Sequence, residues 1–448
     1  MEIYATQSKG IGGVIRSEVE DFVVEEVLVD GTRASATGVA SQGKALGASS
    51  IKNHYLLCVL TKRGWDTFSA IKAVADQLGV DDSRIQIAGI KDANALTSQF
   101  ATVEDVSCDE ISRVNVKDLE IRPLGYVRCK LSSYYLWGNH FRIMIRGLKH
   151  STRVVEERIA ETIKHLRVLG GVPNFFGHQR FGTTRPITHL VGKAFVKGDL
   201  KKAAMLFLAR PSKDEHPESR EARLQLLHTH DFKEAFRTFP RQLRYERTML
   251  KHLAENPEDF GGAFERLPAK LQRLFPQAYQ SYLFNRFLSE RIVRGLPLGG
   301  ACVGDFVVGL DRCGLPLLVM NKVVDGNSLV DVNRAIREGK MCLGIPLLGF
   351  RQQISGGIQG EIEQQILKQE DVAQEDFRIE VMPRLALGGA LRTALTVLQD
   401  LVLNQSSNEP AESSGRSAEI AFSLRRGSYA TVFLREIMKP NNQVEAGY

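Results

Sequence analysis

The chain has 448 residues, of which 43% are hydrophobic and 25% are charged. This ordinary globular composition excludes intrinsic disorder, a collagen helix and a continuous coiled coil. A chain of this length is expected to form two or three domains, each large enough to bury a core. Its net charge of +7 is compatible with a polyanionic partner, although a basic surface in contact with solvent explains the charge equally well.

The sequence carries no signal for a membrane, for secretion or for a metal. No apolar run approaches the roughly 20 residues that a membrane helix needs, and the first residues do not resemble a signal peptide. The six cysteines form no CxxC pair, and the ten histidines form no HExxH motif. We therefore predict a cytoplasmic protein without a bound metal, whose reduced cysteines are mostly structural.

One segment comes close to a phosphate-binding loop. Residues 38–45 read GVASQGKA, but Ala45 stands where that motif needs a hydroxyl to hold Mg²⁺. No strand precedes the segment, and residues 33–50 are rich in Ala, Ser and Gly. A surface linker is the better interpretation.

The first 170 residues contain both sheet and helix patterns. Apolar residues at helical spacing predict helices over 67–78, ended by Gly79, and over 154–169, ended by Gly170. Alternating or continuous apolar runs predict strands over residues 21–27, 54–60, 85–88, 100–103 and 141–145.

The pattern changes near residue 185. Helices are predicted within 193–209, 218–238 and 241–294, and the short apolar runs after Pro297 predict a small β region. Near the end of the chain we expect a strand at 377–382, a helix at 391–403, a polar loop at 404–417, and a turn at residues 427–429 that leads into a strand or a helix.

Four cations recur at spacings of three, three and four residues within the third helical stretch. On a helix this spacing places them on one face, with Glu246 as the nearest acid. This face either contacts solvent or binds RNA phosphates, and the sequence is compatible with both interpretations. The four cations are Arg241, Arg244, Arg247 and Lys251.

Residues 89–99 (GIKDANALTSQ) place Lys91 and Asp92 directly after a short apolar strand. An aspartate in such a loop is commonly a turn or cap residue. A carboxylate beside a lysine in a partly desolvated site can instead serve as a nucleophile or a base.

Two further segments combine aromatic rings with arginines around glycine. Residues 173–182 (PNFFGHQRFG) contain flat apolar faces, amides and a cation, which is what a base-stacking site needs. Residues 422–436 (FSLRRGSYATVFLRE) repeat the combination. Alternatively, the Phe residues fill the core.

Together these three segments resemble the TruD family of tRNA pseudouridine synthases, in the same order along the chain. Residues 173–182 match its Pro-Asn-x-Phe-Gly-x-Gln-Arg-Phe-Gly pattern, and residues 422–436 match its C-terminal pattern, except that Arg425 replaces a usual Pro. Val19 replaces another usual Pro, before Glu20. The family's nucleophile pattern, G-x-K-D-x-x-A-x-T-x-Q, is matched by Gly89, Lys91, Asp92, Ala95, Thr97 and Gln99.

The resemblance implies an α+β fold. Its pseudouridine-synthase core is a mixed, largely antiparallel sheet with flanking helices and a central cleft, and a second α+β domain is inserted into it. The change in pattern along the chain then predicts a discontinuous catalytic domain, 1–185 plus 377–448, and an inserted domain, 186–376.

The resemblance also implies a reaction without a cofactor, the conversion of a tRNA uridine to pseudouridine, with position 13 in the D-arm as the expected target. Asp92 would act at C1′, at the 2′ position or at C6, and these alternatives remain open. Family members are expected to act as monomers. The residues implied to bind substrate are Lys91 (phosphate, or the charge of Asp92), Asn174 (hydrogen bonding), Phe176 (stacking on uracil), Arg180 (phosphate) and Phe422 (pocket wall).

Two other classes of function compete with this one. A non-catalytic RNA-binding protein would need the aromatic and basic segments but not Lys91 and Asp92. A metal-dependent nuclease could use Asp92 with Glu18, Glu20 and Asp21. The nuclease would cut the strand and would stop when a chelator is added, whereas a pseudouridine synthase would do neither.

Overall fold

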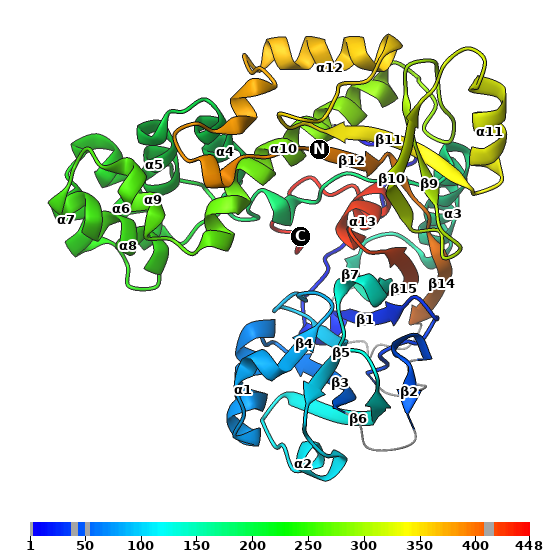
Figure 1. Ribbon diagram of the computed structural model, residues 1–448, viewed down its shortest axis with the longest axis horizontal. Helices are drawn as coiled ribbons and strands as arrows, with labels where there is room; N and C mark the ends of the chain where they lie inside the picture. Colours follow the sequence, from blue (N-terminus) through cyan, green and yellow to red (C-terminus); the bar gives the residue numbers. More distant parts are fainter. Residues whose placement is uncertain (1–2, 37–43, 50–53, 407–415) are drawn as a thin grey trace. The chain divides into compact units, whose positions relative to one another are not determined.

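The computed structural model describes residues 3–36, 44–49, 54–406 and 416–448, and these residues form two compact units (Figure 1). The first, which we call the sheet unit, comprises Thr6–Val172 and Thr396–Gly447. The second, the helix-rich unit, comprises Pro173–Leu395 with residues 3–5 and Tyr448. None of the described helices is long and apolar enough to cross a membrane.

The sheet unit is built on a mixed sheet with strand order β14-β15-β7-β1-β5-β3-β6-β2, with β4 paired to β5. Only the β1–β5 pairing is parallel among those described. The largely antiparallel sheet expected from the resemblance is therefore confirmed. Its strands are β1 (Phe22–Leu28), β2 (Ala48–Ser49), β3 (Tyr55–Arg63), β4 (Ile85–Ile87), β5 (Leu96–Glu104), β6 (Leu119–Val127), β7 (Leu136–Leu148), β14 (Gln399–Ser406) and β15 (Arg416–Arg425).

Strand β3 shows why this sheet forms. Its apolar run does not alternate with polar residues because both faces of the strand are covered. Leu56, Cys58 and Leu60 pack into the cluster that includes helix α1, while Leu57 and Val59 pack into a second cluster on the opposite face. The sheet thus has a hydrophobic core on each side.

Helix α1 (Thr67–Leu78) begins and ends where the sequence predicts. The carboxylate of Asp66 accepts the N–H groups of Phe68 and Ser69, and Gly79 ends the helix in the left-handed conformation. The other helices of the unit are α2 (Cys108–Ser112), α3 (Thr152–Leu169) and α13 (Ala430–Met438).

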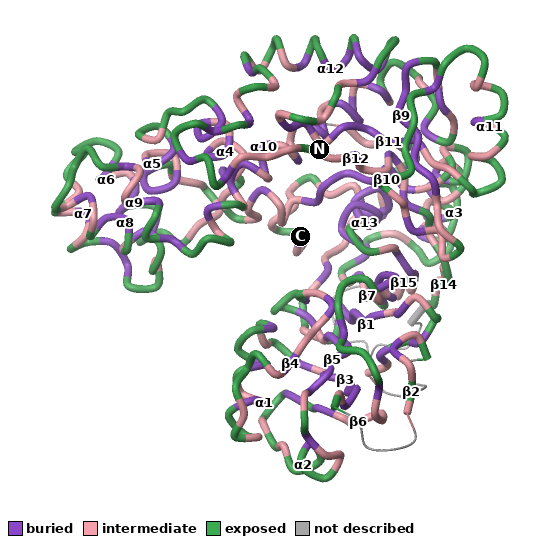
Figure 2. Tube along the Cα trace, viewed as in Figure 1, coloured by how far each residue is buried: buried purple, intermediate pink, exposed green. Residues whose placement is uncertain are grey.

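Every residue of α13 is buried (Figure 2). The N-terminal segment of the sheet unit is bonded to this helix: the N–H and hydroxyl of Thr6 donate to Glu436 Oε2 at 3.0 and 2.8 Å. Further along, the N–H of Ile11 donates to the carbonyl of Ile437 at 3.0 Å. The two ends of the sequence therefore complete one core.

The helix-rich unit combines helices with a four-stranded antiparallel sheet of order β10-β9-β11-β12. The strands are β9 (Phe306–Leu310), β10 (Pro316–Val323), β11 (Met341–Leu347) and β12 (Ala390–Thr393). A separate two-stranded sheet pairs β8 (Val172–Pro173) with β13 (Leu395–Thr396), at the two points where the chain passes from one unit to the other. The helices are α4 (Thr188–Val196), α5 (Leu200–Ala209), α6 (Pro217–Thr229), α7 (Phe232–Thr238), α8 (Arg244–Glu255), α9 (Phe260–Glu265), α10 (Ala269–Val293), α11 (Leu329–Arg337) and α12 (Gly357–Gln369).

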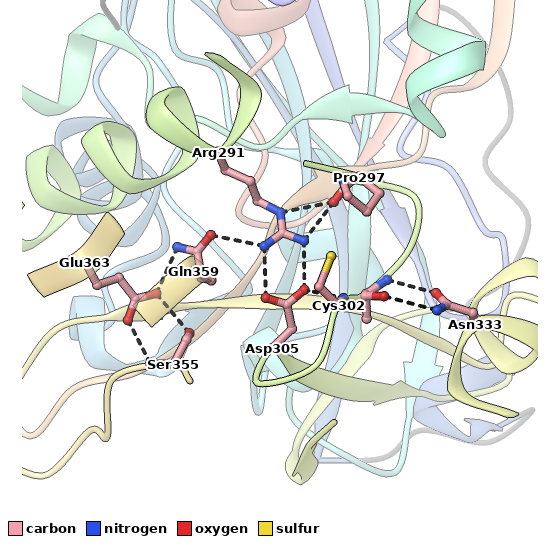
Figure 3. A network of polar contacts seen from close by, with 9 residues as sticks. Arg291, Pro297, Cys302, Asp305, Asn333, Ser355, Gln359 and Glu363 are labelled. Carbon is pink, nitrogen blue, oxygen red and sulfur yellow. Dashed lines mark hydrogen bonds and ion pairs between the residues drawn. The ribbon is translucent and has the colours of Figure 1, made fainter. Parts of the chain in front are cut away.

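A buried polar network holds α10, α12 and β9 together (Figure 3). All five N–H groups of Arg291 are used: they donate to both carboxylate oxygens of Asp305, to the carbonyl of Pro297 and to Gln359 Oε1. The amide of Gln359 in turn donates to Glu363 at 2.9 Å. Burial raises the pKa of Glu363 to about 7.

Two predicted elements near the end of the chain are wrong. Residues 391–403, predicted as a helix, form β12, β13 and much of β14, because pairing with β11 and β15 overrides the helix propensity of their leucines. Residues 377–382, predicted as a strand, contain the end of a 3-10 turn, Glu375–Arg378. The predicted β region after Pro297 also includes two helices, α11 and α12.

The edges of the two units differ from the predicted domain edges. The chain passes between units at 172/173 and 395/396, whereas the sequence places the edges at 185/186 and 376/377. The assignment of one part as catalytic and the other as inserted stays a prediction. Most of the segment 38–45 and of the polar loop 404–417 lies outside the described residues.

Candidate active site

Asp92 lies in the loop that joins β4 to β5 in the sheet unit. Thr67, the first residue of α1, holds this loop: its hydroxyl accepts the N–H of Lys91 at 3.0 Å and lies 3.2 Å from the Lys91 carbonyl. The side-chain amide of Gln99 on β5 donates to the carbonyl of Gly89 at 3.1 Å. Residues of the predicted motif thus fix the conformation of their own loop.

The carboxylate of Asp92 is half exposed and paired with Arg16. Its Oδ2 lies 2.9 Å from Nη2 of Arg16, whose own side chain is 10% exposed. Arg16 is held in place because its Nη1 donates to the carbonyl of Gly447 and its guanidinium lies 4.0 Å over the ring of Phe22. In the part of the chain that the structure describes, Oδ1 of Asp92 accepts no hydrogen bond, so one oxygen is oriented and the other is open to a substrate.

A buried ammonium group fixes the backbone of Asp92. Lys62, at the end of β3, is fully buried, and its Nζ donates to the carbonyls of Asp92 and Trp65 at 2.7 and 2.6 Å. Burial lowers the pKa of Lys62 to about 8, against the opposing charges of Asp92 and Asp66. The loop is therefore anchored at the peptide unit of the candidate nucleophile itself.

Lys91 faces the sheet and pairs with Glu26, not with Asp92. Its side chain is 6% exposed, with Nζ 2.7 Å from Glu26 Oε1 and 2.9 Å from Asn139 Oδ1. The other oxygen of Glu26 accepts the N–H of Phe100 at 2.9 Å. Burial raises the pKa of Glu26, and Lys91 opposes that shift. This geometry supports a role in holding the loop, because an ammonium group bound in this way is directed away from solvent.

The segment 173–182 belongs to the helix-rich unit, where Asn174 is joined to β12. The side-chain amide of Asn174 donates to Thr393 Oγ1 at 2.9 Å, and its Oδ1 accepts Nη2 of Arg392 at 2.8 Å. The carbonyl of Asn174 accepts Nε of the same arginine at 2.9 Å. The hydrogen-bonding groups of the Asn174 amide are thus largely satisfied within this unit.

The ring of Phe176 has a fixed position within the same unit. Asn285 on α10 binds both backbone groups of Phe176, at 2.8 Å to the N–H and 3.0 Å to the carbonyl. The guanidinium of Arg392 lies 4.0 Å over the ring, and Phe284 packs edge-on at a centroid distance of 5.6 Å. Because Arg392 occupies one face of the ring, a base has at most the other face on which to stack.

Arg180 is also bound to α10. Its Nε donates to Ser281 Oγ at 3.1 Å, and its Nη2 donates to Gln277 Oε1 at 3.3 Å. Gln277, Ser281 and Asn285 are spaced four residues apart, so they share one face of α10. That face holds the aromatic segment at both Phe176 and Arg180.

Phe422 on β15 is fully buried in the sheet unit. It stacks on Phe141 at a centroid distance of 5.3 Å and meets Phe433 edge-on at 4.7 Å. The structure gives Phe422 a packing role, and its contact with substrate stays a prediction.

The four predicted cations do not share one helical face, which corrects that expectation. Arg241 lies in the turn before α8, after Pro240, while Arg244 and Lys251 are on α8 and exposed. Arg247 is bound internally, because its Nη1 donates to the carbonyls of Phe236 and Phe239 at 2.9 and 2.7 Å. Glu246 is buried against Arg223 at 2.7 Å and so does not offset the exposed cations.

The predicted residues divide between the two units. Asp92, Lys91 and Phe422 belong to the sheet unit, and Asn174, Phe176 and Arg180 belong to the helix-rich unit. Sequence reasoning missed their principal partners. These are Arg16, Lys62, Glu26, Asn285 and Arg392.

The fold and the anchored aspartate loop define a class of protein, which comparison with solved structures identifies. The crystal structure of a Methanosarcina mazei protein assigned to TruD superposes with a TM-score of 0.83 at 38% identity, over 99% of this chain and 97% of that one. This likeness covers both units. The class is therefore that of TruD-type pseudouridine synthases.

Sequence comparisons agree with the structural one. A family model for tRNA pseudouridine synthase D (TruD) matches residues 1–437. A "Probable tRNA pseudouridine synthase D" from Methanosarcina mazei is 39% identical over 442 residues, covering 98% of this chain and 96% of the relative. Another with the same description, from Methanopyrus kandleri, is 42% identical over 385 residues, covering 86% and 85%. The chain belongs to the TruD family, whose members are isomerases that act on RNA.

Proposed function

We propose that this protein converts a uridine of tRNA to pseudouridine, with Asp92 as the nucleophile or base. The observation that carries the proposal is the carboxylate of Asp92, which has one oxygen held by Arg16, the other open, and its own backbone carbonyl bound by a buried ammonium group. A half-exposed, oriented carboxylate can reach a base or sugar that has left its stack.

The reaction is balanced without a cofactor. The C1′–N1 bond of the uridine breaks, the uracil turns within the site, and a C1′–C5 bond forms. N1 ends with a proton, C5 loses one, and there is no net oxidation or hydrolysis. The protein must supply a carboxylate, a pocket that retains the detached uracil, and access to a base that leaves its stack at a cost of a few kcal/mol. Attack at C1′, at the 2′ position or at C6 is compatible with the exposed oxygen of Asp92.

The proposal also specifies the target nucleotide, the oligomeric state and the cellular compartment. We propose position 13 in the D-arm of tRNA as the target, and action as a monomer in the cytoplasm. The direct test incubates the purified protein with an unmodified tRNA transcript and maps pseudouridine at single-nucleotide resolution, with and without a chelator. Pseudouridine at position 13 in both samples supports the proposal. Strand cleavage that the chelator prevents would favour a nuclease, and unchanged RNA would favour a simple RNA-binding protein.

Phe176→Ala is expected to reduce turnover much more than tRNA binding. Stacking on an aromatic ring is worth roughly 1–3 kcal/mol per base, and here it would act on a single base among many contacts. We therefore expect kcat to fall by about 5- to 150-fold, with tRNA affinity changed by less than about threefold. Single-turnover kinetics and filter binding measure the two quantities.

Because Phe176 is buried, its replacement could also act through packing. Phe176→Leu is the matched variant, since it retains apolar volume but has no flat ring. Urea unfolding of both variants reports the packing cost. The stacking role is ruled out if tRNA binding falls more than turnover, or if the leucine variant is as active as the original protein.

Replacing Arg241, Arg244 and Lys251 together by Gln is expected to weaken tRNA binding. The three side chains are exposed, and each phosphate contact contributes about 0.7–0.9 to the slope of log affinity against log salt. The slope should therefore become shallower by about two to three if these cations contact phosphates. The control replaces Lys322, Arg337 and Lys340, three exposed cations elsewhere in the same unit. Equal slopes for the two triple variants would show that the cations at 241–251 contact only solvent.

A further inference from the structure

The sheet unit contains a hollow of about 470 Å³ that none of the roles above uses. It lies between residues 10–14, the end of β7, and the segment that follows α13. Its volume is within the range of small-ligand pockets in proteins, and it is large enough for a nucleotide-sized group. Its lining residues include Gly10, Gly13, Lys149, His150, Lys439 and Glu445.

Glycines allow the wall of this hollow to form. A Cβ at Gly10 would lie 2.4 Å from the carbonyl oxygen of Met438, and a Cβ at Gly13, which has a φ of +89°, would lie 2.6 Å from Ile145. The wall is then fixed by hydrogen bonds, from the N–H of Gly12 to Met438 at 3.0 Å and from the N–H of Val14 to Arg146 at 2.9 Å. The backbone of the wall is therefore held by the chain's own hydrogen bonds.

The lining of the hollow includes two lysines, Lys149 and Lys439. Among the described residues, no carboxylate lies within ion-pair distance of Lys149, which is exposed at the rim. Lys439 donates to the carbonyls of Thr6 and Ser8, and Glu445 is the acidic residue of the lining. The ammonium group of Lys439 is therefore taken up by the chain's own carbonyls, whereas that of Lys149 is exposed and can contact an anionic occupant.

A further cation lies directly behind the wall. Nη1 of Arg158 donates to the carbonyl of Gly10 at 2.6 Å and to Nε2 of His150 at 2.8 Å. Because Nε2 of His150 accepts a hydrogen bond, the proton of the ring is on Nδ1, which makes that atom a donor. The lining thus combines an ammonium group with an imidazole N–H, and both of these groups can bind a phosphate diester.

The wall of the hollow is joined to the Asp92 site through Arg16. Val14 of the wall precedes Arg16 by two positions, and Ala446 of the wall precedes Gly447. One terminal nitrogen of Arg16 donates to the Gly447 carbonyl, while the other donates to Asp92. Arg16 thus ties the backbone beside this wall to the carboxylate of Asp92.

We propose that this hollow binds a phosphodiester of the RNA strand next to the target uridine, with Lys149 as the principal charge contact. The proposal rests on the proposed function, since it takes RNA as the substrate. The hollow places the strand, while Asp92 performs the chemistry. Lys149 is therefore expected to affect binding of the strand more than the rate of the bound complex.

The first arm of the test measures tRNA binding as a function of salt in the Asp92→Asn background, where no turnover occurs. Lys149→Gln is expected to weaken binding about fivefold at 0.1 M salt and to make the log–log slope shallower by about 0.7–0.9. The matched control is Lys117→Gln, an exposed lysine of the same unit that lies outside the hollow. Equal slopes for the Lys149 and Lys117 variants would overturn the proposal.

The second arm identifies the phosphate. Neutral methylphosphonates replace single phosphodiesters along the D-arm of the transcript. Binding of each transcript is measured, in the same background, to the protein that retains Lys149, to Lys149→Gln and to the Lys117→Gln control. At one position next to the target, the methylphosphonate should weaken binding when Lys149 is present and have no further effect in Lys149→Gln. The proposal is overturned if, at every position tested, the loss of binding caused by the methylphosphonate adds to the loss caused by Lys149→Gln.

A failure of the proposed function is recognised separately. Pseudouridine mapping with the unaltered protein is read in parallel with both binding arms. Absence of pseudouridine would contradict the proposed function. The unaltered protein could instead form pseudouridine normally while the methylphosphonate and Lys149→Gln weaken binding additively. That result would contradict only the role of the hollow.

Discussion

Asp92→Asn is expected to abolish pseudouridine formation while leaving the protein folded and able to bind tRNA. The amide has the shape of the carboxylate and can still accept the hydrogen bond from Arg16, but it is neither a nucleophile nor a base. Loss of such a group commonly lowers kcat by about four orders of magnitude or more. The variant loses the ion pair between Asp92 and Arg16. Because the side chain of Asp92 is half exposed, this pair contributes about 0–1 kcal/mol to stability. Single-turnover mapping, filter binding and urea unfolding measure the three quantities.

The matched control for this variant is Asp105→Asn. Asp105 is also an exposed aspartate of the sheet unit, and its carboxylate is paired at 2.7 Å, with His54. Its positive φ of 51° suits asparagine, so the replacement introduces little strain. The control should keep near-normal turnover. Substantial pseudouridine formation by Asp92→Asn would remove Asp92 from the catalytic role.

Arg291→Met is expected to cause the largest loss of stability in the helix-rich unit. The arginine is fully buried and satisfies both oxygens of Asp305, so its removal leaves a buried carboxylate without a counter-charge (Figure 3). Breaking a buried pair in this way costs about 3–5 kcal/mol. Domains are stable by only about 5–15 kcal/mol, so a fall of about 10 °C in the melting temperature is expected. Differential scanning calorimetry measures it.

Two controls separate the buried pair from a general effect on α10. Arg294→Gln removes a partly exposed arginine of the neighbouring turn, paired with Glu290 at 2.9 Å, and should cost less than about 1 kcal/mol. Combining Arg291→Met with Asp305→Leu removes both charges and should recover much of the stability. Equal melting temperatures for Arg291→Met and Arg294→Gln would contradict this account of the network.

Periodicity predicts two helices of the sheet unit, α1 and α3, well. The predicted bounds of α1 and α3 lie within about two residues of those observed, because their apolar spacing is regular and Gly79 and Gly170 end them in the left-handed conformation. The segment 391–403 shows where this reasoning stops. Its leucines favour a helix locally, but the partners that make it a set of strands, β11 and β15, lie elsewhere in the sequence. Non-local pairing of this kind is invisible to a window of neighbouring residues.

In the candidate site, too, local sequence predicts one part, and the other part depends on residues that are distant in sequence. Motif spacing locates the Asp92 loop and the aromatic segment, since both are contiguous in sequence. The cations around Asp92 cannot be assigned from spacing, because Arg16 precedes β1 and Lys62 lies near the end of β3, and only folding brings them to the loop. One signal in the sequence could have indicated Lys62 as a partner of the loop, because it is a lysine that follows the apolar run of β3. Lys91 is adjacent to Asp92 in sequence, which suggests a partnership, but the structure pairs Lys91 with Glu26.

The two crossings of the chain between its units imply an order of assembly during synthesis. The helix-rich unit is essentially one continuous segment, 173–395, so its core can close once that segment has left the ribosome. The sheet unit cannot close at that stage, because β7 lacks its neighbour β15 and the buried helix α13 has not yet been made. An unpaired strand edge is a site of aggregation. The first-made third of the chain therefore keeps an unpaired edge at β7 until residues 416–425 have been made.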